Sequence, residues 1–403
     1  MQEKARVPAI RFAGFTDAWE QRKLGECFSE RIESMPGGEL LSVTISEGIK
    51  RFSDLGRHNN SNEDKSKYKK VCIGDIAYNS MRMWQGASGY SPYEGIVSPA
   101  YTVLAPNPGI NSQCLAYHFK LPEMIHTFQI NSQGITSDTW NLKFPALSEI
   151  EIFVSADERE QEKIAGFSRH LDHLITLHQR KYSRLCNVKK SMLEKMFPKD
   201  GASVPEIRFA GFTDAWEQRK LSEIADKVTE KNVGLQFVET FTNSAEFGII
   251  SQRDFFDHDI AKLDSLGGYY IVRDEDFVYN PRISTSAPVG PINRNKLGRT
   301  GVMSPLYTVF RPHDIDATYL EHFFKCGYWH SFMNFNGDTG ARSDRFSIKD
   351  EVFFQMPIPM PQIEEQIKIG KYLTHLDHLI TLHQRELERL QNIKKSCLEK
   401  MFV

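Results

Sequence analysis

Two pairs of repeated segments constrain the fold of this chain more than any other feature of its sequence. Fifteen residues recur without a change, as Ile10–Leu24 and again as Ile207–Leu221. Ten further residues recur as Leu171–Arg180 and Leu376–Arg385. A repeat on this scale indicates one module written twice, so we expect two similar halves that meet similar partners.

Between the repeats, the two halves differ almost completely. The segments 25–155 and 222–360 share little beyond the pattern Ser-Pro-x-Tyr-Thr-Val, found at Ser98–Val103 and Ser304–Val309. Gene duplication followed by drift is one interpretation, although drift would spread the changes evenly. The alternative is a constant frame that meets the same partner twice, joined to inserts that meet different targets.

The end of each half predicts a long helix. Apolar residues recur at spacings of three and four from Ile164 and from Ile369, over about five heptads. Ser155 and Glu158 suit a capping box at the first helix start. An apolar stripe of this length needs a partner, so we expect the two helices to pair antiparallel; packing of each helix on its own insert is the alternative. The expected seam contains Leu171, Leu174, His178, Leu185, Leu376, Leu379, His383 and Leu390.

The junction after the first helix has the same order as the two chain ends. In mid-chain, a helix end is followed by the short linker 198–205 and then by the fifteen-residue repeat; the chain stops after one such helix end and starts again just before the other repeat. We therefore expect the chain ends to lie near each other.

Histidines and cysteines leave a metal site open without favouring it. His178 and His383 fall in the apolar seam, where one polar residue per helix can determine the register. A solvated helix face and a metal site are the alternatives. The six cysteines are far apart and include no Cys-x-x-Cys pair, so we interpret them as reduced packing residues.

Composition indicates a water-soluble protein of two or three domains. Of the 403 residues, 40% are hydrophobic and 25% charged, and no apolar run is long enough to cross a membrane. We expect a cytoplasmic location and no membrane partner. The net charge of −2 is low for a protein that holds DNA alone. Either DNA is not the target, or basic residues are local and a partner supplies further phosphate contacts.

The inserts mix strand-like and helix-like patterns, which predicts an α+β class. We expect strands at 71–79, 149–154, 269–279, 302–310 and 352–357, and helices at 112–119 and 317–329. No catalytic signature is present: there is no phosphate-binding loop, and Asn280-Pro281-Arg282 lacks the second proline and the aromatic residue of an amino-methyltransferase pocket. We expect no catalytic residue and no bound metal.

Loops in both inserts mix basic, amide and aromatic side chains. Arginine and lysine recognise guanine edges, and asparagine and glutamine recognise adenine, while hydroxyl groups bind phosphate. The candidate DNA-binding residues of the first insert are Lys67, Lys69, Tyr78, Asn79, Arg82, Trp84, Ser137, Thr139 and Trp140. Those of the second are Asn280, Arg282, Arg294, the Lys296-Leu297 pair, Arg342 and Arg345.

The chain resembles the specificity subunits of type I restriction-modification systems. The resemblance is carried by the two fifteen-residue openings, by Glu160-Gln161-x-Lys163-Ile164 and Glu365-Gln366-x-Lys368-Ile369, and by the endings Lys189–Phe197 and Lys394–Phe402. One departure is that the family has prolines before Glu-Gln. The second copy has them in Pro359-Met360-Pro361, whereas the first has Ser155-Ala156-Asp157.

This resemblance implies an α+β fold with an internal pseudo-two-fold repeat. Two target-recognition domains, 1–155 and 201–360, would be separated by two long antiparallel coiled-coil helices, 156–200 and 361–403. Each domain would recognise half of a bipartite site in double-stranded DNA, and the helix length would set the gap between the halves.

The resemblance also implies partners and their cofactors. Two methyltransferase subunits would methylate adenine with S-adenosylmethionine, and restriction subunits using ATP and Mg²⁺ would join the full complex. This chain would be non-catalytic and would bind no cofactor itself. The alternatives are a coiled-coil scaffold that binds only proteins, and an enzyme with an unrecognised site.

Overall fold

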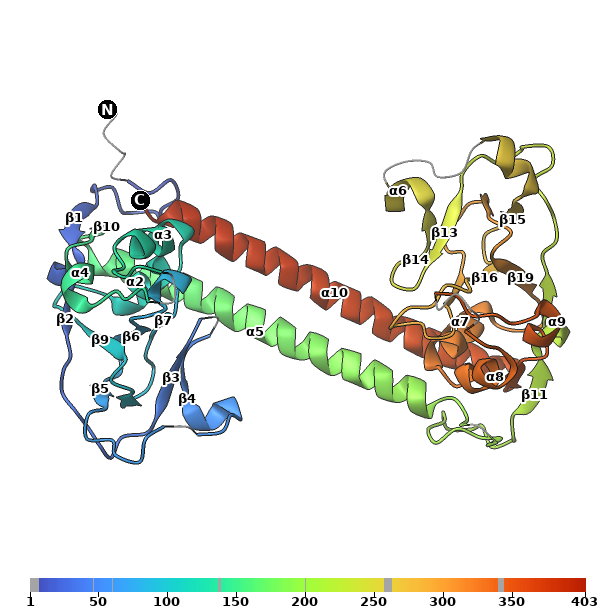
Figure 1. Ribbon diagram of the computed structural model, residues 1–403, viewed down its shortest axis with the longest axis horizontal. Helices are drawn as coiled ribbons and strands as arrows, with labels where there is room; N and C mark the ends of the chain where they lie inside the picture. Colours follow the sequence, from blue (N-terminus) through green and yellow to red (C-terminus); the bar gives the residue numbers. More distant parts are fainter. Residues whose placement is uncertain are drawn as a thin grey trace. The chain divides into compact units, whose positions relative to one another are not determined.

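The computed structural model describes residues 7–45, 47–59, 61–136, 139–199, 201–256, 263–339 and 344–403. The chain divides into two compact units, which are described separately. Unit 1 is Met1–Gln179 with Gln384–Val403, and unit 2 is Arg180–His383. Each unit combines short strands and helices with parts of two long helices, which confirms the α+β class (Figure 1).

The two long helices form where the apolar stripes predict them. Helix α5 spans Glu158–Lys195 and α10 spans Ile363–Met401. Asp157, not Ser155, caps α5, because its Oδ1 accepts a hydrogen bond from the backbone N of Arg159 at 2.9 Å. The predicted capping box at Ser155 is therefore wrong by two residues.

Within unit 1, the first part of α5 packs antiparallel on the last part of α10. Ile164, near the start of α5, lies in one core cluster with Leu398. Leu171 and Ile175, further along α5, share a cluster with Leu390, which comes earlier in α10. As the residue numbers increase along α5, the numbers of the contacting residues on α10 decrease. The two helices are therefore antiparallel, as expected from the sequence.

Unit 2 contains the corresponding pairing of the end of α5 with the start of α10. Met196 lies in one buried cluster with Ile369 and Leu373. A salt bridge joins Lys189 on α5 to Asp377 on α10. The equivalent salt bridge in unit 1 joins Lys394 to Asp172, so there the lysine is on α10 and the aspartate is on α5. Among the seam residues, Leu171, Leu376 and Leu390 are buried, and the half-buried ones are Leu174, His178, Leu185, Leu379 and His383.

Unit 1 is built on a four-stranded antiparallel sheet with the order β2-β9-β6-β7. Its strands are β2 (Phe28–Glu30), β6 (Ile76–Asn79), β7 (Ser88–Tyr90) and β9 (Tyr101–Pro106). Three strand pairs accompany it: β1 (Glu20–Lys23) with β10 (Glu151–Val154), β3 (Leu41–Thr44) with β4 (Gly48–Arg51), and β5 (Lys69–Val71) with β8 (Gly95–Val97). The helices are α1 (Leu24–Cys27), α2 (Ser112–His118), α3 (Pro122–Ile130) and α4 (Phe144–Ser148), with 3-10 turns η1 (Phe52–Leu55) and η2 (Met83–Gln85).

Unit 2 repeats this topology although the inserts share little sequence. Its four-stranded sheet has the order β12-β19-β16-β17, with strands Ala225–Lys227, Thr308–Pro312, Phe277–Tyr279 and Ile292–Arg294. The strand pairs are β11 (Glu217–Lys220) with β20 (Pro357–Met360), β13 (Phe241–Ser244) with β14 (Gly248–Ser251), and β15 (Tyr270–Val272) with β18 (Gly301–Met303). The helices are α6 (Gln252–Phe256), α7 (Ala317–Cys326), α8 (Trp329–Asn336) and α9 (Asp350–Phe353), with 3-10 turns η3 (Leu221–Glu223) and η4 (Leu263–Gly268).

Equivalent junctions close both units. In unit 1 the backbone N of Ile10 donates to the carbonyl of Lys400 at 2.9 Å, so the start of the first repeat lies against the end of α10. In unit 2 the backbone N of Ile207 donates to the carbonyl of Lys195, also at 2.9 Å. The start of the first repeat and the end of α10 are thus close together, as the duplicated order of the segments predicted.

Some expected strands are divided or wrong. The segment 71–79 is split, because β5 ends at Val71 and β6 begins at Ile76, with buried Asp75 accepting a hydrogen bond from the backbone N of Cys72 at 2.7 Å. The segment 269–279 is split in the same way into β15 and β16. The predicted strand 352–357 is wrong: α9 occupies its start and β20 begins only at Pro357.

Candidate nucleic-acid interface

One buried carboxylate binds the fifteen-residue repeat to the start of α5. Glu160 accepts hydrogen bonds from Arg11, at 2.5 Å from Nε and 2.9 Å from Nη2, and from the indole of Trp19 at 3.0 Å. Burial alone would raise the pKa of Glu160, but the hydrogen bonds it accepts, that from Arg11 foremost, outweigh burial and lower its pKa below the ordinary value. The charged carboxylate therefore has a structural role.

Unit 2 contains the same arrangement. Glu365 accepts hydrogen bonds from Arg208 at 2.7 and 2.8 Å and from the indole of Trp216 at 3.2 Å. Both glutamates are fully buried. These contacts within the chain explain why the same arginine, tryptophan and glutamate occur in both copies.

The glutamine after each glutamate joins the long helix to a short helix of its unit. Gln161 accepts a hydrogen bond from the backbone N of Asn111, the N-cap of α2, at 2.8 Å. Gln366 accepts one from the backbone N of Asp316, the N-cap of α7, at 2.9 Å. The Glu-Gln pairs thus hold the frame together and face inward. By contrast, residues 13–14 and 16–18, and their copies 210–211 and 213–215, are exposed in both units.

A Tyr-Asn pair ends the equivalent central strands β6 and β16. Tyr78 and Tyr279 are buried, and burial raises the pKa of both hydroxyls. Tyr78 is therefore a core residue, which corrects its assignment as a DNA contact. Asn79 accepts a hydrogen bond from the backbone N of Met81, and Asn280 accepts one from that of Arg282, at 3.0 and 2.9 Å. Each asparagine shapes the turn into the following loop.

In unit 1, the structure brings together candidate residues from two loops. Trp84 in η2 and Trp140 pack edge to face, with ring centroids 5.2 Å apart and an interplanar angle of 80°. Arg82 and Thr139 are exposed beside them in the chain, and Ser137 lies outside the described residues. The two loops therefore meet through their tryptophan rings, with an exposed basic residue on one loop and an exposed hydroxyl on the other.

In unit 2, the equivalent loops also meet. Arg282, after β16, forms an isolated antiparallel bridge with Arg345, and its guanidinium lies 3.9 Å from the carboxylate of Asp344. Both arginines are exposed, so their guanidinium groups are available to a ligand. Arg342 lies outside the described residues.

The remaining candidates of unit 2 do not form part of this surface. The Arg294 side chain is only 9% exposed and lies 3.0 Å from Glu321 and 3.3 Å from Glu275. Arg294 is thus a structural ion-pair residue, which corrects its assignment as a DNA contact. Lys296 also lies near Glu321, at 3.4 Å, and Leu297 packs half-buried against a core cluster.

The two lysine candidates of unit 1 lie around β5. Lys69 lies on this strand and pairs with Glu30 at 3.2 Å. Lys67 is exposed just before the strand. Of the two, only Lys67 has a fully exposed position from which it could contact a ligand.

Sequence patterns missed several exposed apolar side chains beside these loops. Met81 is 48% exposed and Ile135 is 99% exposed in unit 1, and Phe247 is 59% exposed in unit 2. These positions could have been recognised in the sequence as apolar residues within polar turns. Phe247, which directly precedes Gly248, is an example. They were missed because the candidate DNA-binding residues were chosen for their ability to form hydrogen bonds.

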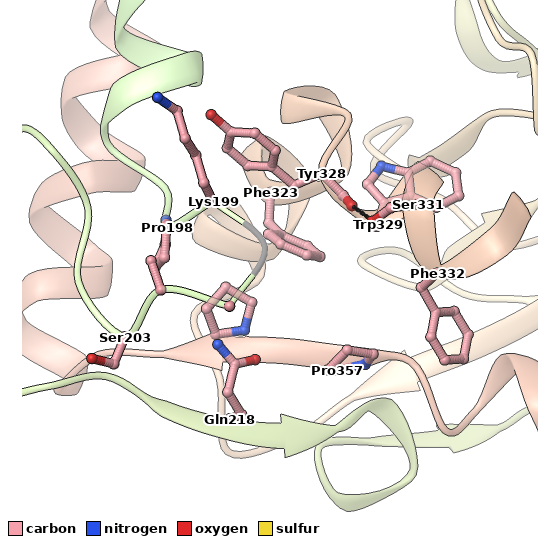
Figure 2. Close-up of a pocket in the computed structure, with 13 residues that line it drawn as sticks. Pro198, Lys199, Ser203, Gln218, Phe323, Tyr328, Trp329, Ser331, Phe332 and Pro357 are labelled. Atoms are coloured by element: carbon pink, nitrogen blue, oxygen red, sulfur yellow. Dashed lines mark hydrogen bonds between the residues drawn. The ribbon is translucent and has the colours of Figure 1, made fainter. Parts of the chain in front are cut away.

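A cavity of about 400 Å³ in unit 2 lies where the linker after α5 crosses strand β20 (Figure 2). Aromatic rings of Phe323, Tyr328 and Phe332 and the ring of Pro357 line it, with Lys199 of the linker beside Tyr328. The Tyr328 hydroxyl donates to the carbonyl of Glu194 on α5. The cavity thus lies where the linker, α8 and β20 meet, and the contact of Tyr328 with α5 indicates a structural junction.

Across the described ranges, no three His, Cys, Asp or Glu side chains are placed to hold a metal ion. Helices in the described part of the chain are all too short or too polar to span a membrane.

Comparisons with known proteins agree on one family. Residues 213–392 match the model of the type I restriction modification DNA specificity domain. The MjaVIII specificity subunit of Methanocaldococcus jannaschii is 23% identical over 359 residues, covering 83% of this chain and 81% of that protein. The putative MjaX specificity subunit of the same organism is 26% identical over 372 residues, covering 83% and 79%.

A solved structure shares the fold. The S subunit of a type I restriction-modification system from M. genitalium aligns with a TM-score of 0.60 at 14% identity, covering 98% of this chain and 99% of that one. The duplicated frame and the Glu-Gln pairs agree with these matches: residues 213–392 are similar to a type I DNA specificity domain, and most of the chain is similar to type I restriction enzyme specificity subunits.

Proposed function

We propose that this chain is the non-catalytic DNA-recognition subunit of a type I restriction-modification system. The observation that supports this most directly is a shared frame with unlike loops. Both units have the same strand order, yet the loop after β6 carries Arg82 and Trp84 whereas the loop after β16 carries Arg282. Different side chains on equivalent loops suit two half-sites of different sequence.

The exposed arginines give each unit a means of recognising bases. A guanidinium presents parallel N–H donors that match O6 and N7 of guanine in the major groove. Arg82 in unit 1 and Arg282 and Arg345 in unit 2 hold this group at the surface. Under this proposal, 1–155 and 201–360 are the target-recognition domains and each binds one half of a bipartite duplex site.

Catalysis comes from partner subunits in this proposal. Two methyltransferase subunits methylate adenine with S-adenosylmethionine, and restriction subunits use ATP and Mg²⁺; the complex acts in the cytoplasm. The identical segments 13–18 and 210–215, exposed except for the half-buried Phe15 and Phe212, suit a partner that is met twice. Sharing of phosphate contacts with that partner is consistent with the net charge of −2.

Footprinting of the chain on DNA, with and without its methyltransferase subunits, tests the proposal. We expect protection of two short segments separated by unprotected base pairs. A protein-only scaffold would leave the DNA unprotected even with the methyltransferase present, and an unrecognised enzyme would modify or cut DNA without any partner.

Exchange of inserts assigns the half-sites. Replacing residues 222–360 by a copy of 25–155 gives both units the same insert within an unchanged frame. The methylated site should then become symmetric, with the unit 1 half-site present twice in opposite orientations. Retention of the original asymmetric site would contradict recognition by the inserts.

Arg345 supports a finer test within unit 2. If its guanidinium contacts a base, Arg345→Ala should weaken discrimination at one base pair by about 1–3 kcal/mol. Arg345→Lys is the matched control, because it keeps the charge and loses the paired donors. A loss of affinity in Arg345→Ala that is uniform across base sequences and is restored by lysine would indicate a phosphate contact instead.

A further inference from the structure

The β3–β4 hairpin of unit 1 and the β13–β14 hairpin of unit 2 have the same strand register, and the residues between their strands differ. Each has a three-residue loop followed by a glycine at positive φ, 70° at Gly48 and 71° at Gly248. The loop of unit 1 presents Ile45, which is 49% exposed. That of unit 2 presents Phe247 at the position next to the glycine.

Phe247 belongs to a group of three exposed aromatic rings. Its centroid lies 6.2 Å from that of Phe255, which lies 4.6 Å from that of Phe256; both pairs are edge to face. The three residues are 59%, 41% and 37% exposed. Phe255 and Phe256 lie on α6, which follows β14 directly (Figure 1). Clustered apolar surface of this kind marks a contact site.

Hydrogen bonds from amide side chains join this hairpin to the loop that carries Arg282. Asn280 donates to the carbonyl of Asn243 on β13 at 2.8 Å. Asn293 donates to the side-chain oxygen of Asn243 at 2.7 Å and to the carbonyl of Ser244 at 3.1 Å. The hairpin and the candidate DNA-binding loop are therefore held together as one element of unit 2.

Unit 1 makes the same connection with a different residue. Lys120 donates from Nζ to the carbonyl of Ile45 at the hairpin tip, at 3.0 Å, and to that of Gly86 at the end of the η2 loop, at 2.6 Å. In both units a hairpin tip is thus fixed beside the loop that follows the central strand, although the linking residues are unrelated.

We propose that the hairpin tips are a second DNA-recognition element, and that Phe247 and Phe255 contact thymine methyl groups in the half-site of unit 2. This inference rests on the proposed function. A partner met twice requires a surface that both units share, whereas the tips differ, so the tips belong with the parts that select sequence. Phenyl rings have no hydrogen-bonding group, and the base feature that suits them in the major groove is the C5-methyl group of thymine.

The test removes the methyl group from the DNA rather than altering the protein first. The full chain, assembled with its methyltransferase subunits, is titrated with a duplex containing its site, in which thymines are replaced one at a time by deoxyuridine. Base pairing is kept and only the methyl group is lost. We expect about fourfold weaker binding for each contacted methyl in the half-site assigned to unit 2 by insert exchange.

Protein variants then locate the contact. In a Phe247→Ala/Phe255→Ala chain, the deoxyuridine effect should disappear from the unit 2 half-site and persist elsewhere. Ile45→Ala should act only on the half-site of unit 1. Val233→Ala, which truncates a side chain 80% exposed elsewhere in unit 2, is the matched control and should retain every deoxyuridine effect. Unchanged thermal unfolding midpoints show that the variants are folded.

The inference would be overturned if replacing each thymine of the unit 2 half-site by deoxyuridine left the binding affinity unchanged. It would also be overturned if the phenylalanine variant lost affinity for the methyltransferase subunits while keeping its base preferences, because the rings would then contact protein. In both cases sequence-specific binding by the wild-type complex would persist and the proposed function would stand. Absence of such binding by the wild type would refute both.

Discussion

The buried His118 of unit 1 makes stability depend on pH in a way that a single substitution should remove. Its ring is stacked on that of Phe402, with centroids 4.6 Å apart and an interplanar angle of 1°, and its Nδ1 has no hydrogen-bond partner among the residues that the structure describes. Burial lowers the pKa of His118 to about 4, from an ordinary value of 6.5. The native state thus excludes a proton that the unfolded chain binds.

The sign and size of the effect follow from these two pKa values. Well above pH 6.5 the histidine is neutral in both the native and the unfolded state, so it does not make the free energy of unfolding depend on pH. As the pH falls towards 4, only the unfolded chain takes up the proton, and each pH unit in this window destabilises the native state by about 1.4 kcal/mol. The loss is about 2 kcal/mol at pH 5 and about 3 kcal/mol at pH 4.

His118→Phe is the appropriate perturbation, because unit 2 has Phe323 at the same helical position. There Phe323 lies 5.9 Å from Phe197, which corresponds to Phe402. Urea unfolding of the wild type and the variant should be compared at pH 7 and pH 5, using the transition of unit 1. We expect the variant to gain about 2 kcal/mol relative to the wild type between these pH values, since titrations common to both proteins cancel.

The reverse substitution provides the control. Phe323→His should introduce a similar acid sensitivity into unit 2. If the difference between wild type and His118→Phe changes by less than about 0.5 kcal/mol from pH 7 to pH 5, the histidine is protonated in the native state and the reasoning is refuted.

Three further predictions concern the buried carboxylates, one strained backbone position and the length of the long helices. Glu160→Gln removes the carboxylate that pairs with Arg11 and should destabilise unit 1 by about 3–5 kcal/mol in urea unfolding, while Glu365→Gln should do the same to unit 2; a loss under 1 kcal/mol would contradict a structural role. Leu235 has a positive φ of 51° and is 48% exposed, so Leu235→Gly should stabilise unit 2 by about 0.5–1 kcal/mol in thermal unfolding, and destabilisation would argue against this backbone strain. Deleting one heptad from each of α5 and α10 should change the number of base pairs between the half-sites without changing their bases, as measured by mapping methylated adenines; an unchanged gap would exclude the helices as the spacer.

Periodicity and repetition in the sequence were sufficient to predict the frame. Helices α5 and α10 carry apolar stripes over many turns, and a signal repeated this often outweighs local exceptions. The duplicated Glu-Gln pairs and the fifteen-residue segments indicated the family. Strands of the inserts were harder to predict, because most span only three or four residues and a period-two pattern of that length does not separate a strand from a turn or a short helix.

The candidate site shows the limit of local patterns. Tyr78 and Asn79 are adjacent and both carry a hydrogen-bonding group, yet Tyr78 lies in the core and Asn79 shapes a loop. Arg294 looked available to DNA because its partner Glu321 lies 27 residues away in the sequence, which local composition does not reveal.

The sequence alone determined that two copies of one frame exist, that each ends in a long amphipathic helix, and that different inserts interrupt them. Only the tertiary structure decided which polar residues are buried against partners within the chain and which are exposed at the surface. It also revealed that unrelated residues, Lys120 in unit 1 and Asn280 in unit 2, hold each hairpin beside its loop by hydrogen bonds. The physical reason is that these hydrogen bonds join segments far apart in the chain, and the partner of a side chain across such a separation leaves no periodic trace in the sequence.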